Sequence, residues 1–233
     1  MSQRLVIRLI PINIFVVCML AGWGAIGAIR GMINTRGLPS AAETAVAGVA
    51  GAAGALQGSH PAAGAGTGSL SPVFTPEVQH WADKIVSWSA VFKLDPNLAA
   101  TVMQIESCGA PGAVSGAGAQ GLFQVMPFHF TAGEDTLDPD TNAARGLAYL
   151  ALGLARASSD AGLALAGYNG GHGLIGQDSS LWPAQTQRYW YWGTGIYQDA
   201  ASGQPQSGRL QEWLQAGGAS LCAQADGELG LNQ

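Results

Sequence analysis

After residue 74, apolar side chains recur at helical spacing along most of the chain, and this pattern predicts a set of packed helices. The first predicted helix begins at Thr75, because a threonine cap followed by proline at the first helical position is a common helix start. Its apolar face consists of Val78, Trp81, Ile85, Trp88 and Phe92. We interpret the two tryptophans as core residues, since aromatic side chains at helical spacing usually pack inward; the alternative is a platform for a sugar ring.

A second helix is predicted from residue 95 to about residue 107, directly after the first. Asp95 is a suitable N-cap, and Pro96 suits the first helical turn. The apolar face of this helix is made of Leu98, Val102 and Ile105. Gly109 and Pro111 end it, because glycine favours left-handed termination and proline cannot continue a helix.

The rest of the pattern is also helical. We predict a short, mostly buried helix at residues 122–130, longer helices at 138–156 and 160–171, and a last short helix at 210–214. The aromatic-rich segment at residues 185–197 is interpreted as a helix packed over the core, with one or two rings bordering a sugar-binding groove as the alternative. Strand patterns are nearly absent, so the predicted fold class is all-α.

The N-terminal part has a different pattern. No charged residue interrupts residues 9–29, and this apolar stretch matches the ~20 residues that a membrane-spanning helix needs. Arg4 and Arg8 precede it, so we predict an uncleaved signal anchor. A signal peptide cleaved late, near residues 45–47, is the alternative. Arg30 and Arg36 follow the stretch, so the distribution of positive charge hardly fixes its orientation.

These patterns divide the 233-residue chain into four parts. Residues 1–36 form the predicted transmembrane signal anchor, 37–73 an Ala/Gly-rich flexible linker, 74–200 the main domain, and 201–233 a C-terminal extension docked on it. The linker has too few large apolar side chains to offset the entropy of ordering it. Residues 72–233 carry six basic and fourteen acidic side chains, which argues against nucleic acid as a partner because nucleic-acid binding depends on neutralising phosphates.

The chain has three cysteines, of which Cys18 lies in the apolar N-terminal stretch. If the main domain is exported, Cys108 and Cys222 are expected to form a disulfide; two unrelated buried thiols are the alternative. The four histidines show neither an HExxH motif nor a Cys/His ladder, so we expect no metal ion and no cofactor. A cysteine nucleophile at Cys108 with His129 or His172 is a rival chemistry, weakened by the available disulfide partner.

Glu106 is the candidate for a catalytic acid. It lies in the last turn of the second predicted helix, where the negative end of the helix macrodipole disfavours a carboxylate. An apolar wall beside it would disfavour the charge further, and both effects raise the pKa of a carboxyl group. A glutamic acid that keeps its proton near neutral pH can donate that proton to a leaving oxygen. The alternative is a solvated surface glutamate at a helix end.

Three sequence motifs carry a family resemblance. The first is Glu106-Ser107, the second is AVSGAGAQGLFQVMP at residues 113–127, and the third is GYNGG at residues 167–171. Together and in this order they resemble the signature of the Slt-type lytic transglycosylases, which are relatives of goose-type lysozyme. The resemblance covers about residues 76–197.

The resemblance implies a helical lysozyme-like fold, with Glu106 as the single catalytic acid. It also implies substrate-binding roles for Ser107, Ser115, Gln124, Met126, Tyr168 and Asn169, with Ser115 orienting the acid. This sequence departs from the family pattern at two positions. Phe123 replaces a usual methionine and is expected to narrow the groove; Gly170 replaces a usual alanine and is expected to loosen a helix end.

Most glycosidases use two carboxylates about 5 to 9.5 Å apart, whereas the site-bearing stretch offers one. Nearby acids are interpreted as solvated or capping residues: Glu134, Asp135, Asp138 and Asp140. The resemblance implies that Glu106 acts first as acid and then as base, while the C6 hydroxyl of N-acetylmuramic acid closes onto C1. A hydrolytic muramidase of the same fold and a non-catalytic wall-binding module are the alternatives.

The resemblance also implies the setting of the protein. Its expected partners are the glycan strands of peptidoglycan, together with the membrane through the N-terminal helix. The catalytic domain is accordingly expected to be extracytoplasmic, at the cell surface or in the periplasm.

Overall fold

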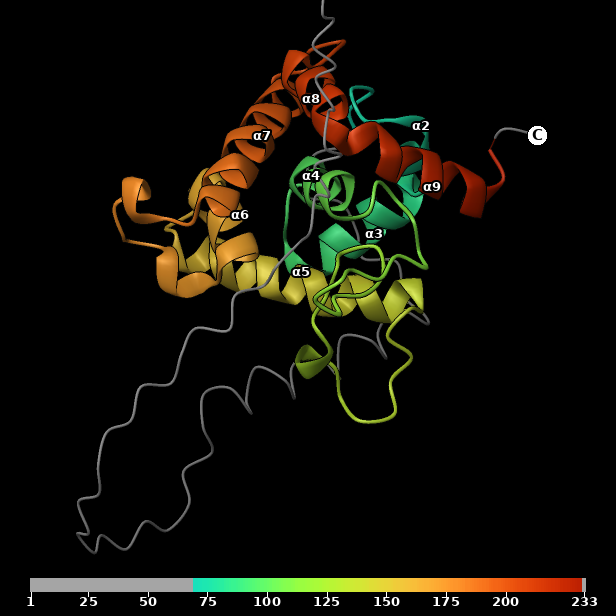
Figure 1. The fold of residues 1–233 in the computed structure, drawn as a ribbon, viewed down its shortest axis with the longest axis horizontal. Coiled ribbons are helices and arrows are strands. Elements are labelled where there is room, and N and C mark those ends of the chain that lie inside the picture. Colours follow the sequence, from blue (N-terminus) through green and yellow to red (C-terminus); the bar gives the residue numbers. More distant parts are fainter. Residues whose placement is uncertain (1–68, 232–233) are drawn as a thin grey trace, which may run out of the picture.

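The computed structural model describes residues 69–231 (Figure 1). The predicted signal anchor and nearly all of the predicted linker lie outside these residues. Within the part of the chain that is described, no helix is both long enough and apolar enough to span a bilayer.

The described residues form helices joined by turns and loops. The α-helices are α2 (Pro76–Gln79), α3 (Ala82–Phe92), α4 (Pro96–Glu106), α5 (Pro139–Arg156), α6 (Ala161–Gly170), α7 (Ala184–Ala201), α8 (Gly208–Trp213) and α9 (Ala219–Leu229). Shorter helical turns are η1 (Pro127–His129), η2 (His172–Leu174), η3 (Ser179–Leu181) and the π-helical η4 (Leu214–Gly218). Only isolated β-bridges occur over residues 69–231, so the prediction of a mainly helical domain is confirmed.

Helix α4 lies at the centre of the domain. It contacts α2, α3 and α7, while α5 runs along the bottom of the view in Figure 1. All residues from Leu98 to Glu106 are buried. The amphipathic pattern of α4 predicts packing on one face, whereas the structure encloses the helix on all sides. Ala99 and Ala100 are both 0% exposed, and their small side chains let neighbouring helices approach closely. The core therefore fixes the position of the residue at the end of α4.

The helix starts follow the predicted capping residues. Asp95, Asp138 and Asp160 precede α4, α5 and α6, and each side chain accepts a hydrogen bond of 2.8 Å from a backbone N–H of the first turn. Such caps satisfy donors that the helix itself leaves unpaired. The predicted starts of these helices are therefore confirmed.

The first predicted helix is divided into α2 and α3, because the backbone breaks at Trp81. The Trp81 indole N–H donates to the carbonyl oxygen of Gly109 over 2.9 Å, and this bond ties the break to the end of α4. Trp88 is 3% exposed and stacks against Trp81, with ring centroids 6.1 Å apart. Both tryptophans thus pack inward, as their spacing predicts.

The helix predicted at residues 122–130 is wrong. Gln120 instead forms isolated bridges with Val114 and Val125, and Gln124 has a left-handed φ of 46° that a helix does not allow. Only Pro127–His129 is helical, and Phe128 is 74% exposed rather than buried. Long-range contacts, described below for Asn142, override the local apolar pattern.

The domain limits differ from the predicted ones at the N-terminal side. Ser71 and Val73, assigned to the linker, are 7% exposed and belong to the folded domain. The C-terminal extension forms α8, η4 and α9, and α9 packs against α2. Cys222 of α9 is joined by a disulfide to Cys108, two residues beyond α4, with a Cα–Cα distance of 4.9 Å.

Candidate active site

Glu106 is the last residue of α4 and is 5% exposed. Burial raises the pKa of its carboxyl group from 4.5 to about 8, and the Tyr189 hydroxyl acts in the opposite direction. Its place at the carboxyl end of α4 also disfavours the anion. The expected apolar surroundings and raised pKa are therefore present, and the alternative of a solvated surface glutamate does not fit them.

Tyr189 of α7 faces the carboxyl group of Glu106. Both residues are 5% exposed, and burial, together with the nearby Glu106 carboxyl group, raises the pKa of the Tyr189 hydroxyl well above its ordinary value. The two groups interact without meeting strict hydrogen-bond geometry, so within residues 69–231 neither Glu106 Oε2 nor the Tyr189 hydroxyl has a well-formed hydrogen bond. The pair therefore has unused hydrogen-bonding capacity in a dry environment.

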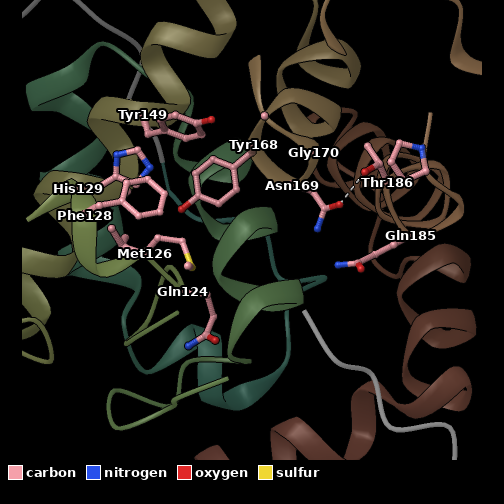
Figure 2. Close-up of a pocket in the computed structure, with 14 residues that line it drawn as sticks. Gln124, Met126, Phe128, His129, Tyr149, Tyr168, Asn169, Gly170, Gln185 and Thr186 are labelled. Carbon is pink, nitrogen blue, oxygen red and sulfur yellow. Dashed lines mark hydrogen bonds between the residues drawn. The ribbon is translucent and has the colours of Figure 1, made fainter. Parts of the chain in front are cut away.

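A cleft of about 240 Å³ lies between the segment that follows Gln124 and the helices α5, α6 and α7 (Figure 2). The residues that line it are Gln124, Val125, Met126, Phe128, His129, Gly146, Tyr149, Tyr168, Asn169, Gly170, Gly171, Pro183, Gln185 and Thr186. Glu106 is not one of them. It is connected to the cleft through α7, on which Tyr189 faces the carboxyl group and Thr186, about one turn earlier, lines the cleft.

Tyr168 and Asn169 follow one another near the end of α6 and both line the cleft. The Tyr168 hydroxyl donates to the carbonyl oxygen of Phe123 over 2.7 Å, which fixes the ring against the loop. Thr186 donates to Asn169 Oδ1 over 3.0 Å (Figure 2), so the Asn169 amide N–H groups are directed away from that contact. Asn169 can therefore offer a donor to a ligand.

Gln124 also lines the cleft, with its side chain held in one orientation. Its amide nitrogen donates to the carbonyl oxygens of Ala113 and Gly121, both over 3.0 Å. The group left for a ligand is accordingly the amide oxygen, which accepts from an N–H or O–H. Its left-handed backbone, uncommon for a residue other than glycine, is maintained by these bonds.

The two serines have positioning roles. Ser107 is 0% exposed, donates to the carbonyl oxygen of Leu122 over 2.7 Å and accepts from Gly109 N–H, so its hydroxyl is engaged within the protein and its contact with substrate stays a prediction. The Ser115 hydroxyl accepts from Ala119 N–H over 3.0 Å and closes its own turn. This contact differs from the predicted one, in which Ser115 orients Glu106.

The two departures from the family pattern have effects other than those expected. Phe123 is 0% exposed and packs edge-on against Trp88, so its side chain is part of the core and does not narrow the cleft. A Cβ at Gly170 would lie 2.3 Å from Leu174 and 2.7 Å from Thr186. Glycine at this position therefore allows Leu174 and Thr186 to approach the end of α6 closely. The sequence instead predicts that this glycine loosens the helix end.

An aromatic cluster forms one end of the cleft. Tyr149 stacks on His172 with ring centroids 4.0 Å apart, and His129 lies 4.9 Å from Tyr149 (Figure 2 labels His129 and Tyr149). Burial lowers the pKa of both histidines, which favours neutral imidazoles at neutral pH. Cys108 is in a disulfide in this structure, so it does not form a nucleophilic pair with either histidine.

The other acids of this region have structural partners. Glu134 pairs with Arg145, and Asp140 pairs with Lys84 over 2.8 Å. No aspartate or glutamate lines the cleft within the described range. Glu106 is therefore the single acid available to this site.

One group of metal-ligand type occurs within residues 69–231: Glu77, Cys108 and Cys222 have ligand atoms within 4.8 Å of one another. Both sulfur atoms belong to the disulfide, and a disulfide supplies no thiolate to a metal ion. This group therefore does not fit a metal site while the bond is formed.

Sequence reasoning missed two residues of the site. Tyr189 was assigned to a packed aromatic segment, with only a generic alternative at a groove, and its periodicity carried no sign of the contact with Glu106. Asn142 was part of a helix start, yet it is 0% exposed and accepts from Phe123 N–H over 2.8 Å while donating to Gln120 O over 2.7 Å. A polar residue on an otherwise apolar helix face is the signal that could have identified it.

The described residues thus combine a mainly helical domain, one buried acid and a cleft lined by no carboxylate. Residues 83–190 match the family model described as "Transglycosylase SLT domain". A similar curated protein is "Transglycosylase" of Enterobacteria phage PRD1, 39% identical over 113 residues, which are 47% of this chain and 40% of that protein. The chain thus spans less than half of that relative's length.

A similar solved structure is an inactive mutant of the lytic transglycosylase Slt from Pseudomonas aeruginosa. The identity is 22%, the TM-score is 0.39, and the match covers 65% of this chain and 24% of that one.

Proposed function

We propose that this protein is a peptidoglycan lytic transglycosylase with a lysozyme-like domain, which cleaves the β-1,4 bond between N-acetylmuramic acid and N-acetylglucosamine. The observation that carries the proposal is Glu106, a buried acid with a pKa of about 8 that is connected through α7 to a cleft lined by no carboxyl group. At neutral pH such an acid holds its proton and can donate it.

The absence of a second carboxylate along the described cleft favours a nucleophile supplied by the substrate. Asp95 lies at the opposite end of α4, roughly 16 Å away for an eleven-residue helix, and is too far to assist. Two-carboxylate mechanisms need the second group within about 9.5 Å. The C6 hydroxyl of the muramic acid residue is a nucleophile that needs no further protein carboxylate.

The proposed reaction has two proton transfers at Glu106. The acid first protonates the glycosidic oxygen, the bond from that oxygen to C1 breaks, and N-acetylglucosamine leaves with a free 4-hydroxyl. The Glu106 carboxylate then takes the proton of the C6 hydroxyl as O6 bonds to C1. The products are a 1,6-anhydromuramic acid end and a regenerated acid, with no water consumed.

The cleft residues have distinct roles in this proposal. Gln124 offers its amide oxygen to the N–H of an N-acetyl group, and Asn169 offers its amide N–H to a carbonyl or hydroxyl oxygen. Tyr189 stabilises the carboxylate that forms after the first step, because its hydroxyl favours the charged form of Glu106. Met126 supplies an apolar wall of the cleft.

Digestion of purified peptidoglycan, followed by mass spectrometry of the fragments, tests the proposal. We expect 1,6-anhydromuramic acid ends; reducing muramic acid ends would instead identify a hydrolytic muramidase. Glu106→Gln is expected to abolish cleavage, because the amide keeps the shape of the side chain but has no proton to transfer. Asp83 is an exposed residue of α3, and Asp83→Asn makes the matched acid-to-amide change there. This variant should remain active.

We also propose that the protein is held at the membrane by an N-terminal signal anchor with its catalytic domain outside the cytoplasm. The Cys108–Cys222 disulfide supports an oxidising location, since such bonds persist mainly in exported proteins. Protease treatment of intact cells or spheroplasts, with the domain detected by antibody, tests this location. A domain protected in both preparations would contradict it.

A further inference from the structure

A second groove, here called the outer groove, lies between α7, α8 and η3 and has a volume of about 620 Å³. It is lined by Ser179, Ser180, Ala184, Gln187, Arg188, Trp190, Tyr191, Trp192 and Glu212. Its volume falls within the range of about 300–1,000 Å³ typical of small-ligand sites. The proposed reaction uses none of these side chains.

Most α7 side chains of the outer groove point away from the catalytic acid; Trp192, three residues after Tyr189, is the exception. Gln187, Arg188 and Tyr191 share one face of the helix, because residues three and four positions apart lie above one another. Tyr189, which faces Glu106, is rotated by about 200° from both Gln187 and Tyr191 at roughly 100° per residue. A ligand in the outer groove would therefore leave the cleft unobstructed.

Tyr191 presents a fixed aromatic ring to the outer groove. The Arg209 guanidinium lies 3.5 Å from the centre of the ring, and the Tyr191 hydroxyl donates to Glu212 over 3.2 Å. Tyr191 is nevertheless 45% exposed. Arg209 covers one face of the ring, which leaves the other face for a ligand whose C–H groups can stack on it.

Trp190 adds a second ring that is 37% exposed. It packs edge-on against Trp182 at 6.0 Å, and its indole nitrogen lies close to Gly162, where a Cβ would be only 3.0 Å from it. These contacts with Trp182 and Gly162 therefore fix the orientation of the Trp190 ring. Two exposed aromatic rings held in place at one groove favour a ligand with flat, weakly polar faces, such as a sugar ring.

Arg188 supplies a positive charge without a protein partner. It is exposed, and no ion pair to it is found within residues 69–231. The domain carries only six basic side chains against fourteen acidic ones from residue 72 onward, and Arg188 is one of the six. Glu212 also lines the groove, but it pairs with Arg209 over 3.7 Å and so leaves Arg188 as the unpaired charge there. This charge is complementary to a carboxylate, whereas the domain as a whole repels anions.

We propose that the outer groove is a second peptidoglycan-binding site, in which sugar rings stack on Tyr191 and Trp190 and a stem-peptide carboxylate pairs with Arg188. The identity of the ligand rests on the proposed function. The site would hold the enzyme on the wall through a strand other than the one in the cleft.

The test measures binding of the full-length chain carrying Glu106→Gln to insoluble peptidoglycan sacculi, so that no digestion occurs. Arg188→Glu and Tyr191→Ala, added singly, are each expected to weaken binding by about five- to ten-fold, the effect of one lost stack or charge pair. Lys93→Glu makes the same charge change at the end of α3, and Tyr191→Phe keeps the ring. Neither control should weaken binding more than about two-fold.

Sacculi whose stem peptides have been removed by an amidase separate the two contacts. On them Arg188→Glu should no longer weaken binding, whereas Tyr191→Ala still should. An equal loss for Arg188→Glu on both preparations would contradict the carboxylate assignment. Unchanged thermal melting of each variant shows that a loss of binding does not come from unfolding.

Three outcomes would overturn the proposal. The first is sacculus binding unaffected by both Arg188→Glu and Tyr191→Ala. The second is a shift from dimer to monomer in either variant, which would make the groove an interface between copies of the chain. The third is a loss of binding to anionic lipid vesicles in either variant, while that variant still binds sacculi. Because binding is measured without catalysis, a failure of the proposed reaction would appear separately, as the absence of cleavage products from the wild type.

Discussion

Replacing Glu106 by glutamine tests the physical state of the acid separately from its chemistry. The folded protein holds the Glu106 proton up to a pKa of about 8, whereas the unfolded chain releases it near 4.5. The folded state therefore binds more protons between these values, so the wild-type free energy of unfolding falls as the pH rises through this window. Glutamine has no proton to release, so the free energy of unfolding of the variant does not fall with pH for this reason.

The size of the effect follows from the two pKa values. Each pH unit between them lowers the wild-type stability by about 1.4 kcal/mol relative to the variant. The difference should accordingly widen by about 2 to 3 kcal/mol between pH 5 and pH 7, in favour of Glu106→Gln. All other titrating groups are shared by the two proteins, so they cancel in the comparison.

Urea unfolding of both proteins at pH 5, 6, 7 and 8, followed by tryptophan fluorescence, measures this difference. The m-values should agree, so that the shift in midpoint reports stability alone. A stability difference that stays constant across this range would mean that Glu106 titrates at its ordinary pKa in the folded protein. Glu106 would then be ionised at neutral pH and could not serve as the general acid.

Three further predictions concern the surroundings of the acid. Tyr189→Phe should raise the pKa of Glu106 further and lower kcat, seen as a displaced alkaline limb of the pH–rate profile; an unmoved limb would contradict the contact. Asn142→Ala should destabilise the domain by about 2 to 4 kcal/mol in urea unfolding, because it leaves buried backbone groups unpaired; a loss below about 1 kcal/mol would oppose this. Reducing Cys108–Cys222 should lower Tm and activity, with a chain-entropy contribution of up to about 4 to 5 kcal/mol, whereas two free thiols in the untreated protein would exclude the bond.

The helical framework could be predicted from the sequence because its signals are local. Asp95, Asp138 and Asp160 each cap a helix within the same short segment, and apolar spacing identified the helices that follow. The end of α4 at Glu106 was likewise predicted, together with the cause of the raised pKa. The caps and the helix end depend on neighbours only a few residues away, whereas the burial that raises the pKa of Glu106 comes from tertiary packing.

The walls of the site could not be predicted in this way. The segment at residues 122–130 has an apolar pattern that favours a helix. Its backbone is instead held by Asn142, which lies nineteen residues after Phe123 and accepts a hydrogen bond from the Phe123 N–H. The contact between Tyr189 and Glu106 joins two helices that are far apart in sequence, and nothing in the local spacing of Tyr189 indicates it. Such contacts are set by tertiary packing, which overrides local preference.

The enclosure of α4 has a consequence for how this protein can change. Because the acid ends a helix that is buried on every side, substitutions along α4 disturb the core and the acid together. The segment at residues 126–129 and the outer faces of α6 and α7 are more exposed and can vary with less effect on stability. New substrate preferences are therefore expected to arise, in evolution or in engineering, from these surface parts while α4 stays nearly fixed.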